Sequence, residues 1–164
     1  MRFHILSFQE SCEFYSEKPY VFISITDPIA KTYSSLIRHP NYPAKHLAYQ
    51  LNQHKLKDVL RLFFWDIDTD NPSEISEEYR NGIFTWKQAN HILTFYEKWQ
   101  AKVNRICVHC YAGVSRSSGV VSALEIISNG QGSDEWILEP HRRFIPNQYV
   151  KNLILKAANE RGLI

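Results

Sequence analysis

Residues 109–117 read His-Cys-Tyr-Ala-Gly-Val-Ser-Arg-Ser and combine a thiol, a guanidinium group and hydroxyl groups at close spacing. Five residues separate Cys110 from Arg116. An apolar run over residues 106–108 precedes the segment, and the pattern after it predicts a helix over residues 116–128. A strand, a tight loop and a helix N-terminus in this order form a cradle for an anion, because backbone N–H groups and the helix dipole both attract negative charge.

The residue types in this segment each have a chemical use in such a cradle. The cradle stabilises a thiolate at Cys110, which is the nucleophilic form of cysteine, and Arg116 can bind two phosphate oxygens at once. Gly113 allows a backbone conformation that side chains forbid and lets N–H groups approach the anion. The backbone N–H groups available for phosphate binding belong to Tyr111, Ala112, Gly113, Val114, Ser115 and Arg116. The segment therefore indicates hydrolysis of a phosphate ester through a phosphocysteine.

A thiolate that expels an alkoxide or a phenoxide also needs a general acid. The acid should be a carboxyl group at the same edge of the sheet as the nucleophile. The segment Asp66-Ile67-Asp68-Thr69-Asp70 follows directly after a strand predicted over residues 59–65, and either Asp66 or Asp68 can supply the proton. The alternative is that these aspartates are solvated turn residues, which are common between elements.

The segment 109–117 resembles the active-site loop of the cysteine-dependent protein tyrosine and dual-specificity phosphatases. The core of their signature is His-Cys, five residues, Arg, and then Ser or Thr, and this chain fills every fixed position. Rhodanese-like and arsenate-reductase-like loops share only the cysteine and the arginine at this spacing. The chain is most similar in length to the small compact phosphatases, including bacterial or phage-like tyrosine phosphatases. The resemblance implies a catalytic loop and not a structural cysteine before a helix.

The resemblance also implies roles for residues around the loop. It favours Asp66 as the general acid, with Asp68 as the close alternative. It implies that the Ser117 hydroxyl bonds the sulfur and helps it leave, and that His109 supports the loop and the thiolate from a buried position. Asn147 matches an asparagine that braces the phosphate loop from the start of the last helix, although a plain helix N-cap explains the same residue equally well.

Further apolar and amphipathic runs predict the elements that position this loop. The patterns favour strands over residues 3–6, 20–25, 59–65 and 105–109, and helices over residues 43–54, 85–100, 116–128 and a stretch that contains 150–157. Strands that alternate with helices indicate an α/β fold, with a mostly parallel central sheet of about four strands and helices on both faces. Ligands of such sheets bind beyond the carboxyl ends of the strands. We expect residues 1–164 to form a single domain.

The composition is ordinary for a soluble globular protein, with 44% hydrophobic and 22% charged residues. A net charge of +2 is too small to indicate binding to nucleic acid or to an anionic membrane. Cys12, Cys107 and Cys110 do not form a secreted disulfide framework, and the first residues lack the apolar stretch of a signal peptide. We therefore expect a cytoplasmic protein. We interpret Cys107 and Cys12 as packing residues, and His141-Arg142-Arg143 as a basic surface cluster near the site.

These observations predict a phosphomonoester hydrolase, specifically a protein-tyrosine or dual-specificity phosphatase that acts on a phosphorylated protein or a small phosphomonoester. One alternative is a phosphatase of nucleotides, RNA 5′-phosphates or inositol phosphates. The loop lacks the lysines that flank the glycine in phosphoinositide-specific relatives, which disfavours a polyanionic lipid. The other alternative is a non-catalytic phosphate-binding module. We expect no metal ion and no organic cofactor, since the thiol, the arginine and the acid suffice for the reaction.

Overall fold

The computed structural model describes residues 1–28, 55–69 and 71–164. Its elements, in chain order, are β1 (Arg2–Leu6), α1 (Phe8–Glu13), β2 (Tyr20–Thr26), β3 (Leu56–Phe63), the 3-10 turn η1 (Pro72–Glu74), α4 (Glu77–Arg80), α5 (Trp86–Trp99), β4 (Arg105–His109), α6 (Arg116–Asn129), the 3-10 turn η2 (Glu135–Ile137) and α7 (Gln148–Glu160). Most predicted strands and helices are therefore found close to their expected ends. The helix predicted over residues 43–54 lies outside the described residues.

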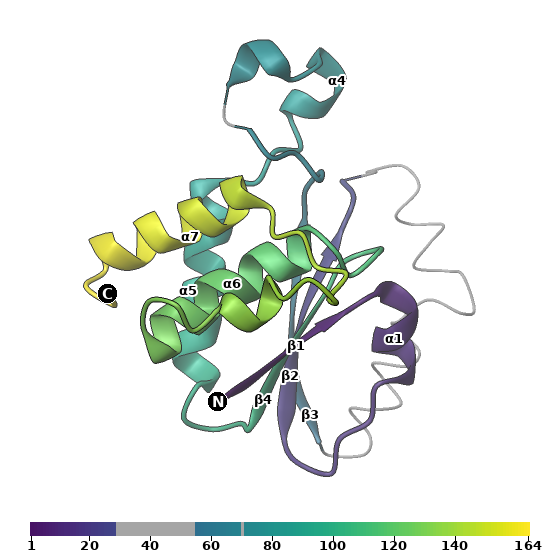
Figure 1. Cartoon of the computed structure of the whole chain (residues 1–164), viewed down its shortest axis with the longest axis vertical. Helices are drawn as coiled ribbons and strands as arrows, with labels where there is room; N and C mark the ends of the chain where they lie inside the picture. The colour runs from purple at the N-terminus through teal and green to yellow at the C-terminus, as the bar shows by residue number, and fades with distance from the viewer. Residues whose placement is uncertain (29–54, 70) are drawn as a thin grey trace.

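The four strands form one sheet in the order β1-β4-β2-β3. Every neighbouring pair is parallel, so the prediction of a mostly parallel sheet of about four strands is confirmed. In a parallel sheet all carboxyl ends lie at one edge. The segments that follow β1, β2, β3 and β4 therefore start from the same edge of the sheet, as Figure 1 shows.

Strand β3 begins and ends earlier than the predicted range of 59–65. It lies at the edge of the described sheet, and side chains such as Lys57 are exposed there. An edge strand needs no continuous apolar run, which is why the hydrophobic pattern did not reveal its start. Beyond the strand, the backbone N–H of Trp65 donates to the carbonyl of Gly82 at 2.8 Å, so the chain has turned away from the sheet by this point.

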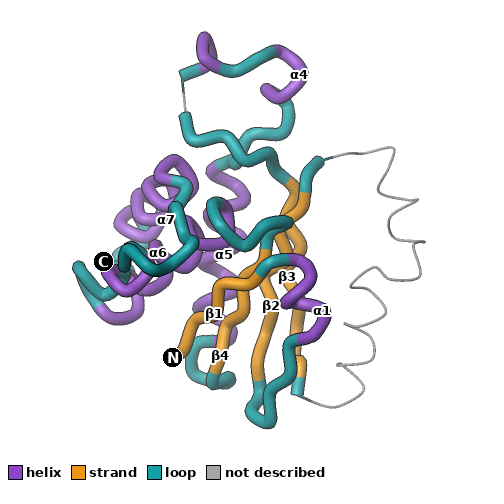
Figure 2. The backbone as a smooth tube through the Cα atoms, turned by 45° about the vertical axis from the view of Figure 1, so that its right-hand side comes forward, coloured by secondary structure: helices purple, strands orange, loops and turns teal. Residues whose placement is uncertain are grey.

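The described helices lie on both faces of the sheet. Figure 2 shows α5, α6 and α7 on one side and the short α1 on the other. The alternation of side chains along β2 matches this arrangement. Val21, Ile23 and Ile25 belong to the larger core beneath the three helices, whereas Tyr20 and Phe22 belong to a smaller cluster on the opposite face. The expectation of helices on both faces is confirmed.

Among the described helices, α6 is the most deeply buried, since every residue from Arg116 to Ile126 is buried. Small residues let its first turn approach the start of α7. A Cβ atom added at Gly119 would lie 2.7 Å from the backbone oxygen of Asn147, so no side chain fits between the two helices there. The N-termini of α6 and α7 are thereby held side by side at the carboxyl edge of the sheet.

None of the helices in the described ranges combines the length and the apolar character needed to cross a membrane.

Candidate active site

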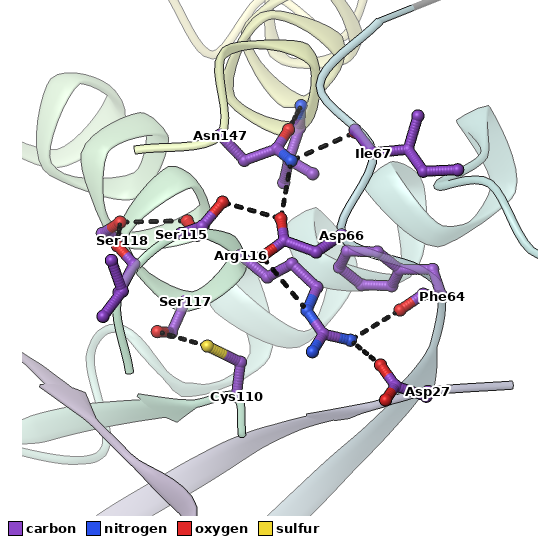
Figure 3. A network of polar contacts seen from close by, with 12 residues as sticks. Asp27, Phe64, Asp66, Ile67, Cys110, Ser115, Arg116, Ser117, Ser118 and Asn147 are labelled. Carbon is purple, nitrogen blue, oxygen red and sulfur yellow. Dashed lines mark hydrogen bonds and ion pairs between the residues drawn. The ribbon is translucent and has the colours of Figure 1, made fainter. Parts of the chain in front are cut away.

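Segments that are far apart in the sequence meet at the carboxyl edge of the sheet (Figure 3). Asp27 follows β2, Asp66 follows β3, and Cys110 follows β4 directly. The N-termini of α6, with Arg116, and of α7, with Asn147 as its N-cap, complete the group. The structure therefore brings most of the sequence-predicted site residues together at the place where ligands of parallel sheets bind.

The phosphate loop, which we define as residues 110–116, is packed closely against the end of β1. Gly113 has a φ of 67°, in the left-handed region that favours glycine. A Cβ atom at this position would lie 2.4 Å from the backbone nitrogen of Ser7. The backbone N–H of Phe8 donates to the carbonyl oxygen of Tyr111 at 3.0 Å. Both the turn and the close approach therefore require glycine at position 113.

Cys110 lies at the start of this loop and is almost fully buried. Its Sγ atom is 3.2 Å from the Oγ atom of Ser117, which is fully buried in the first turn of α6. The N-terminus of a helix carries partial positive charge, which favours a thiolate close to it. The structure thus places the thiol and the hydroxyl in hydrogen-bond contact, as the resemblance implied.

Arg116 is held by one edge of its guanidinium group. Its Nη1 atom donates to Oδ1 of Asp27 at 2.6 Å and to the carbonyl oxygen of Phe64 at 2.8 Å. Its Nε atom is buried and has no hydrogen-bond partner among the described residues. That atom lies 4.0 Å from Oδ2 of Asp66. Anchoring at Nη1 orients a planar group that can bind an oxyanion through its remaining N–H groups.

The two candidate acids have different surroundings. Oδ1 of Asp66 accepts hydrogen bonds from the Ser115 hydroxyl at 2.6 Å and from Nδ2 of Asn147 at 3.0 Å. Asp66 therefore contacts the phosphate loop directly. Oδ1 of Asp68 instead accepts from the backbone N–H of Tyr149 at 2.7 Å, in the first turn of α7. This contact caps a helix and directs Asp68 away from the loop.

Asn147 is the N-cap of α7, and its side chain also contacts the segment after β3, whereas its contact with the phosphate loop is made by its backbone. Its Oδ1 atom accepts from the backbone N–H of Val150 at 2.9 Å, which is an N-cap contact. Its Nδ2 atom donates to Asp66 and also to the carbonyl oxygen of Ile67 at 3.1 Å. Its backbone N–H donates to the carbonyl oxygen of Ser115 at 3.2 Å. One buried asparagine therefore joins α7, the phosphate loop and the segment after β3.

His109 is buried between aromatic rings at the end of β4. Its ring contacts Phe8 and Phe22 edge-on, with centroid distances of 6.2 and 6.1 Å. Burial lowers the pKa of His109 to about 4, the nearby backbone of Cys110 acts in the opposite direction, and the charge of Arg116 lowers the pKa further. Its Nδ1 atom has no hydrogen-bond partner in the described part of the chain. The ring therefore packs as an uncharged imidazole at neutral pH, directly before the phosphate loop.

Sequence reasoning missed three contributions to this site. Asp27 was not considered, although it lies two residues after the end of a predicted strand, close to the position that Asp66 has after its own strand. Ser115 was considered only for its backbone N–H, and its hydroxyl contacts Asp66. Ser118 was not considered, and its hydroxyl donates to the carbonyl oxygens of Val114 and Ser115, the latter at 2.9 Å. The position of Asp27 at a strand end was the one available signal.

The basic cluster 141–143 is balanced by acidic residues. Arg143 pairs with Glu10, and Arg142 and His141 lie 3.4 and 3.2 Å from Oε2 of Glu139. The described residues that carry these charges therefore form a mixed surface and not a strong positive patch.

Alternation along β4 separates the two neighbouring cysteines. Cys107 is fully buried in the smaller cluster with Phe22, whereas Cys110 belongs to the larger core on the other face. Burial raises the pKa of the Cys107 thiol well above its usual range. These observations agree with the interpretation of Cys107 as a packing residue.

Within the described ranges, no group of three or more His, Cys, Asp and Glu side chains is placed to hold a metal ion.

The sheet and its helices have the fold of the cysteine-dependent tyrosine and dual-specificity phosphatases. PTPMT1 in complex with PI(5)P is similar with a TM-score of 0.51 and 17% identity, over 87% of this chain and 78% of that one. Tk-PTP in the active form is similar with a TM-score of 0.52 and 15% identity, over 96% of this chain and 90% of that one. No family model matches the chain, and no curated protein sequence matches it.

Proposed function

We propose that residues 1–164 form one phosphatase domain that hydrolyses phosphomonoesters through a phosphocysteine on Cys110, with phosphotyrosine proteins as the main substrates and dual specificity as an extension. One observation carries the proposal. Cys110, the anchored Arg116 and Asp66 converge on a loop whose backbone turns at a positive-φ glycine before a helix N-terminus. Such a loop binds a phosphate dianion, and the side chains around it supply a nucleophile and an acid.

The first step transfers the phosphoryl group to sulfur. Backbone N–H groups of residues 111–116 and the free edge of Arg116 hold the phosphate oxygens. The Cys110 thiolate attacks phosphorus in line, so that an S–P bond forms while the P–O bond to the leaving group breaks. Asp66 gives its proton to the leaving oxygen. The transition state of phosphoryl transfer is loose, and positioning and charge stabilisation therefore account for most of the rate.

The second step releases phosphate. Asp66, now a carboxylate, takes a proton from a water molecule whose oxygen attacks phosphorus. The S–P bond breaks and Cys110 leaves as a thiolate. The Ser117 hydroxyl, 3.2 Å from the sulfur, donates a hydrogen bond that stabilises this leaving thiolate. The enzyme returns to its starting state with Asp66 protonated.

A second candidate substrate is a phosphoinositide. Its support is the similarity in fold to PTPMT1, whose structure was solved with PI(5)P. The chemistry of this site favours the protein substrate, because the variable loop positions carry no lysine or arginine and the cluster 141–143 is paired with acidic groups. We also propose a cytoplasmic location, which fits three free thiols in a reducing compartment.

Hydrolysis of p-nitrophenyl phosphate in EDTA and reductant tests the proposed chemistry. We expect turnover that Cys110→Ser abolishes, and a phosphotyrosine peptide that reacts faster than a phosphothreonine peptide or PI(5)P in vesicles. Cys107→Ser is the matched control, since this thiol faces the other core. Equal turnover by wild type and Cys110→Ser contradicts the cysteine mechanism. If PI(5)P is hydrolysed faster than the peptides, the cysteine mechanism stands but the substrate class is a phosphoinositide and not a phosphoprotein.

A further inference from the structure

The two carboxylate oxygens of Asp66 are not equivalent. Oδ1 accepts two hydrogen bonds, from the Ser115 hydroxyl at 2.6 Å and from Nδ2 of Asn147 at 3.0 Å. Oδ2 is the oxygen on the side of Arg116, 4.0 Å from its Nε atom. Figure 3 shows the carboxylate of Asp66 between these donors and the guanidinium group. The two hydrogen bonds to Oδ1 therefore hold the carboxylate in one orientation.

A carboxyl oxygen has two lone pairs in its plane, and two good donors occupy both of them. A proton on Oδ1 would displace one of these donors. We propose that Ser115 and Asn147 orient Asp66 so that Oδ2 carries the catalytic proton and faces the phosphate. Ser115 acts as a positioning residue through its hydroxyl group. This inference rests on the proposed function of the site. The Ser115 side chain thus has a role of its own, in addition to the backbone N–H of Ser115 that binds phosphate.

The proton follows one path in both steps. Asp66 releases the proton from Oδ2 to the leaving oxygen while the P–O bond breaks. In the second step Oδ2 takes a proton from the attacking water while the S–P bond breaks. Oδ1 keeps both hydrogen bonds throughout, so the carboxylate does not need to rotate between the two steps.

Ser115 suits this task because its backbone is fixed on several sides. Its carbonyl oxygen accepts hydrogen bonds from the backbone N–H of Asn147 at 3.2 Å, from the hydroxyl of Ser118 at 2.9 Å and from the backbone N–H of Gly119 at 2.9 Å. It is also the N-cap residue of α6, next to Arg116. The same residue therefore joins the loop that holds the phosphate to the acid, and it sets the distance between the two.

The test compares two aryl phosphates that differ in their need for an acid. Phenyl phosphate has a poor leaving group and depends on proton transfer, whereas p-nitrophenolate leaves readily. In Ser115→Ala we expect the loss of kcat/KM, which depends on the first step alone, to be roughly tenfold or more greater on phenyl phosphate than on p-nitrophenyl phosphate. Ser115→Thr, which keeps the hydroxyl, should restore the ratio. Ser133→Ala is the matched control, because the Ser133 hydroxyl has no hydrogen-bond partner among the described residues.

A double-mutant cycle separates positioning of the acid from damage to the loop. In an Asp66→Asn background, we expect Ser115→Ala to leave the ratio of the two substrates unchanged, because the acid has already been removed. An equal loss of kcat/KM on both substrates overturns the proposal, as does the same selective loss in the Asp66→Asn background.

A readout that does not depend on turnover keeps this inference separate from the proposed function. The carboxyl carbon-13 resonance of Asp66 should move when Ser115→Ala removes a donor from Oδ1, and it should stay in place in Ser133→Ala. An unmoved resonance in Ser115→Ala overturns the inference even where Cys110-dependent hydrolysis is observed. If the resonance moves but the protein shows no such hydrolysis, the contact between Ser115 and Asp66 is supported and only the proposed function is rejected.

Discussion

The anchoring of Arg116 shows how much the site depends on single side chains. The guanidinium group is nearly buried, and a buried charge needs a partner. Asp27 provides that partner at 2.6 Å, and the Phe64 carbonyl oxygen accepts from the same Nη1 atom. With Nη1 committed to these two acceptors, the rest of the guanidinium group is available to an oxyanion. Asp27 thus takes part in the candidate site through its ion pair with Arg116.

We predict that Asp27→Asn lowers kcat/KM for aryl phosphates by roughly ten- to a hundredfold, because the amide keeps the shape but loses the charge that orients Arg116. Inhibition by inorganic phosphate should weaken in parallel, since the ground state also uses the guanidinium group. The control is Asp58→Asn, which removes the charge of an aspartate that pairs with the exposed Lys98 at 2.7 Å, away from the site. Unchanged phosphate inhibition in Asp27→Asn would contradict the assigned role.

The relation between the phosphate loop and β1 is decided by packing between elements. The loop follows β4, which is paired with β1, and Leu6 is in register with His109. The chain that leaves β1 therefore passes directly beside the loop, and the backbone of Leu6 and Ser7 occupies the space where a side chain at position 113 would lie. Gly113 therefore permits both the turn of the phosphate loop and the close contact of that loop with the chain after β1.

We predict that Gly113→Ala destabilises the protein by about 2–4 kcal/mol, because it combines a positive φ with a clash against backbone. Gly162→Ala is the matched control. Gly162 has the same φ, 67°, but a Cβ atom there meets nothing within 4 Å. Backbone strain alone should cost about 1–2 kcal/mol. Urea unfolding measures both changes, and equal losses of stability would show that the close approach to Ser7 contributes nothing.

At the scale of the whole molecule, the sheet separates two apolar clusters, and two histidines contact aromatic rings of the smaller one. His109 lies at the carboxyl end of β4, and His4 contacts the Phe14 ring on the smaller-cluster face. Burial and the charges of Arg105 and Arg2 lower the pKa of His4, in the same direction as for His109. Both residues favour a folded state in which they stay uncharged. The stability of the fold should therefore depend on pH.

The sign follows from proton binding. The pKa of His109 is about 4 in the folded protein against 6.5 for an ordinary histidine, so the unfolded chain binds more protons between these values. Its contribution to stability is complete above about pH 6.5 and is lost as the pH falls toward 4. We predict that the free energy of unfolding drops by about 2 kcal/mol between about pH 7.5 and about pH 5 through His109.

Urea unfolding at the two pH values, for wild type and His109→Gln, measures this dependence. The variant should lose most of the pH-dependent part, whatever its absolute stability. The same slope in both proteins would show that other groups are responsible.

Local sequence was sufficient for most of the longer described elements and for the core of the motif. The alternation around 105–109, the helical pattern after Arg116 and the amphipathic run that becomes α5 each predicted their element, because these signals depend on residues close in the chain. The start of β3 could not be predicted, since an edge strand shares its polar side chains with loops. The choice between Asp66 and Asp68 also stayed open, because either carboxylate could have faced the loop.

The sequence by itself therefore determined the chemical identity of the loop, the parallel α/β architecture and the edge of the sheet where the site would lie. Only the tertiary structure decided the partners of the reacting groups. Arg116 and Asp27 are 89 residues apart, Ser115 and Asp66 are 49 apart, and Asn147 and Asp66 are 81 apart. Such contacts depend on the order and register of the strands and on how closely α6 and α7 pack. No local pattern encodes those quantities, since they arise from the simultaneous packing of all the elements.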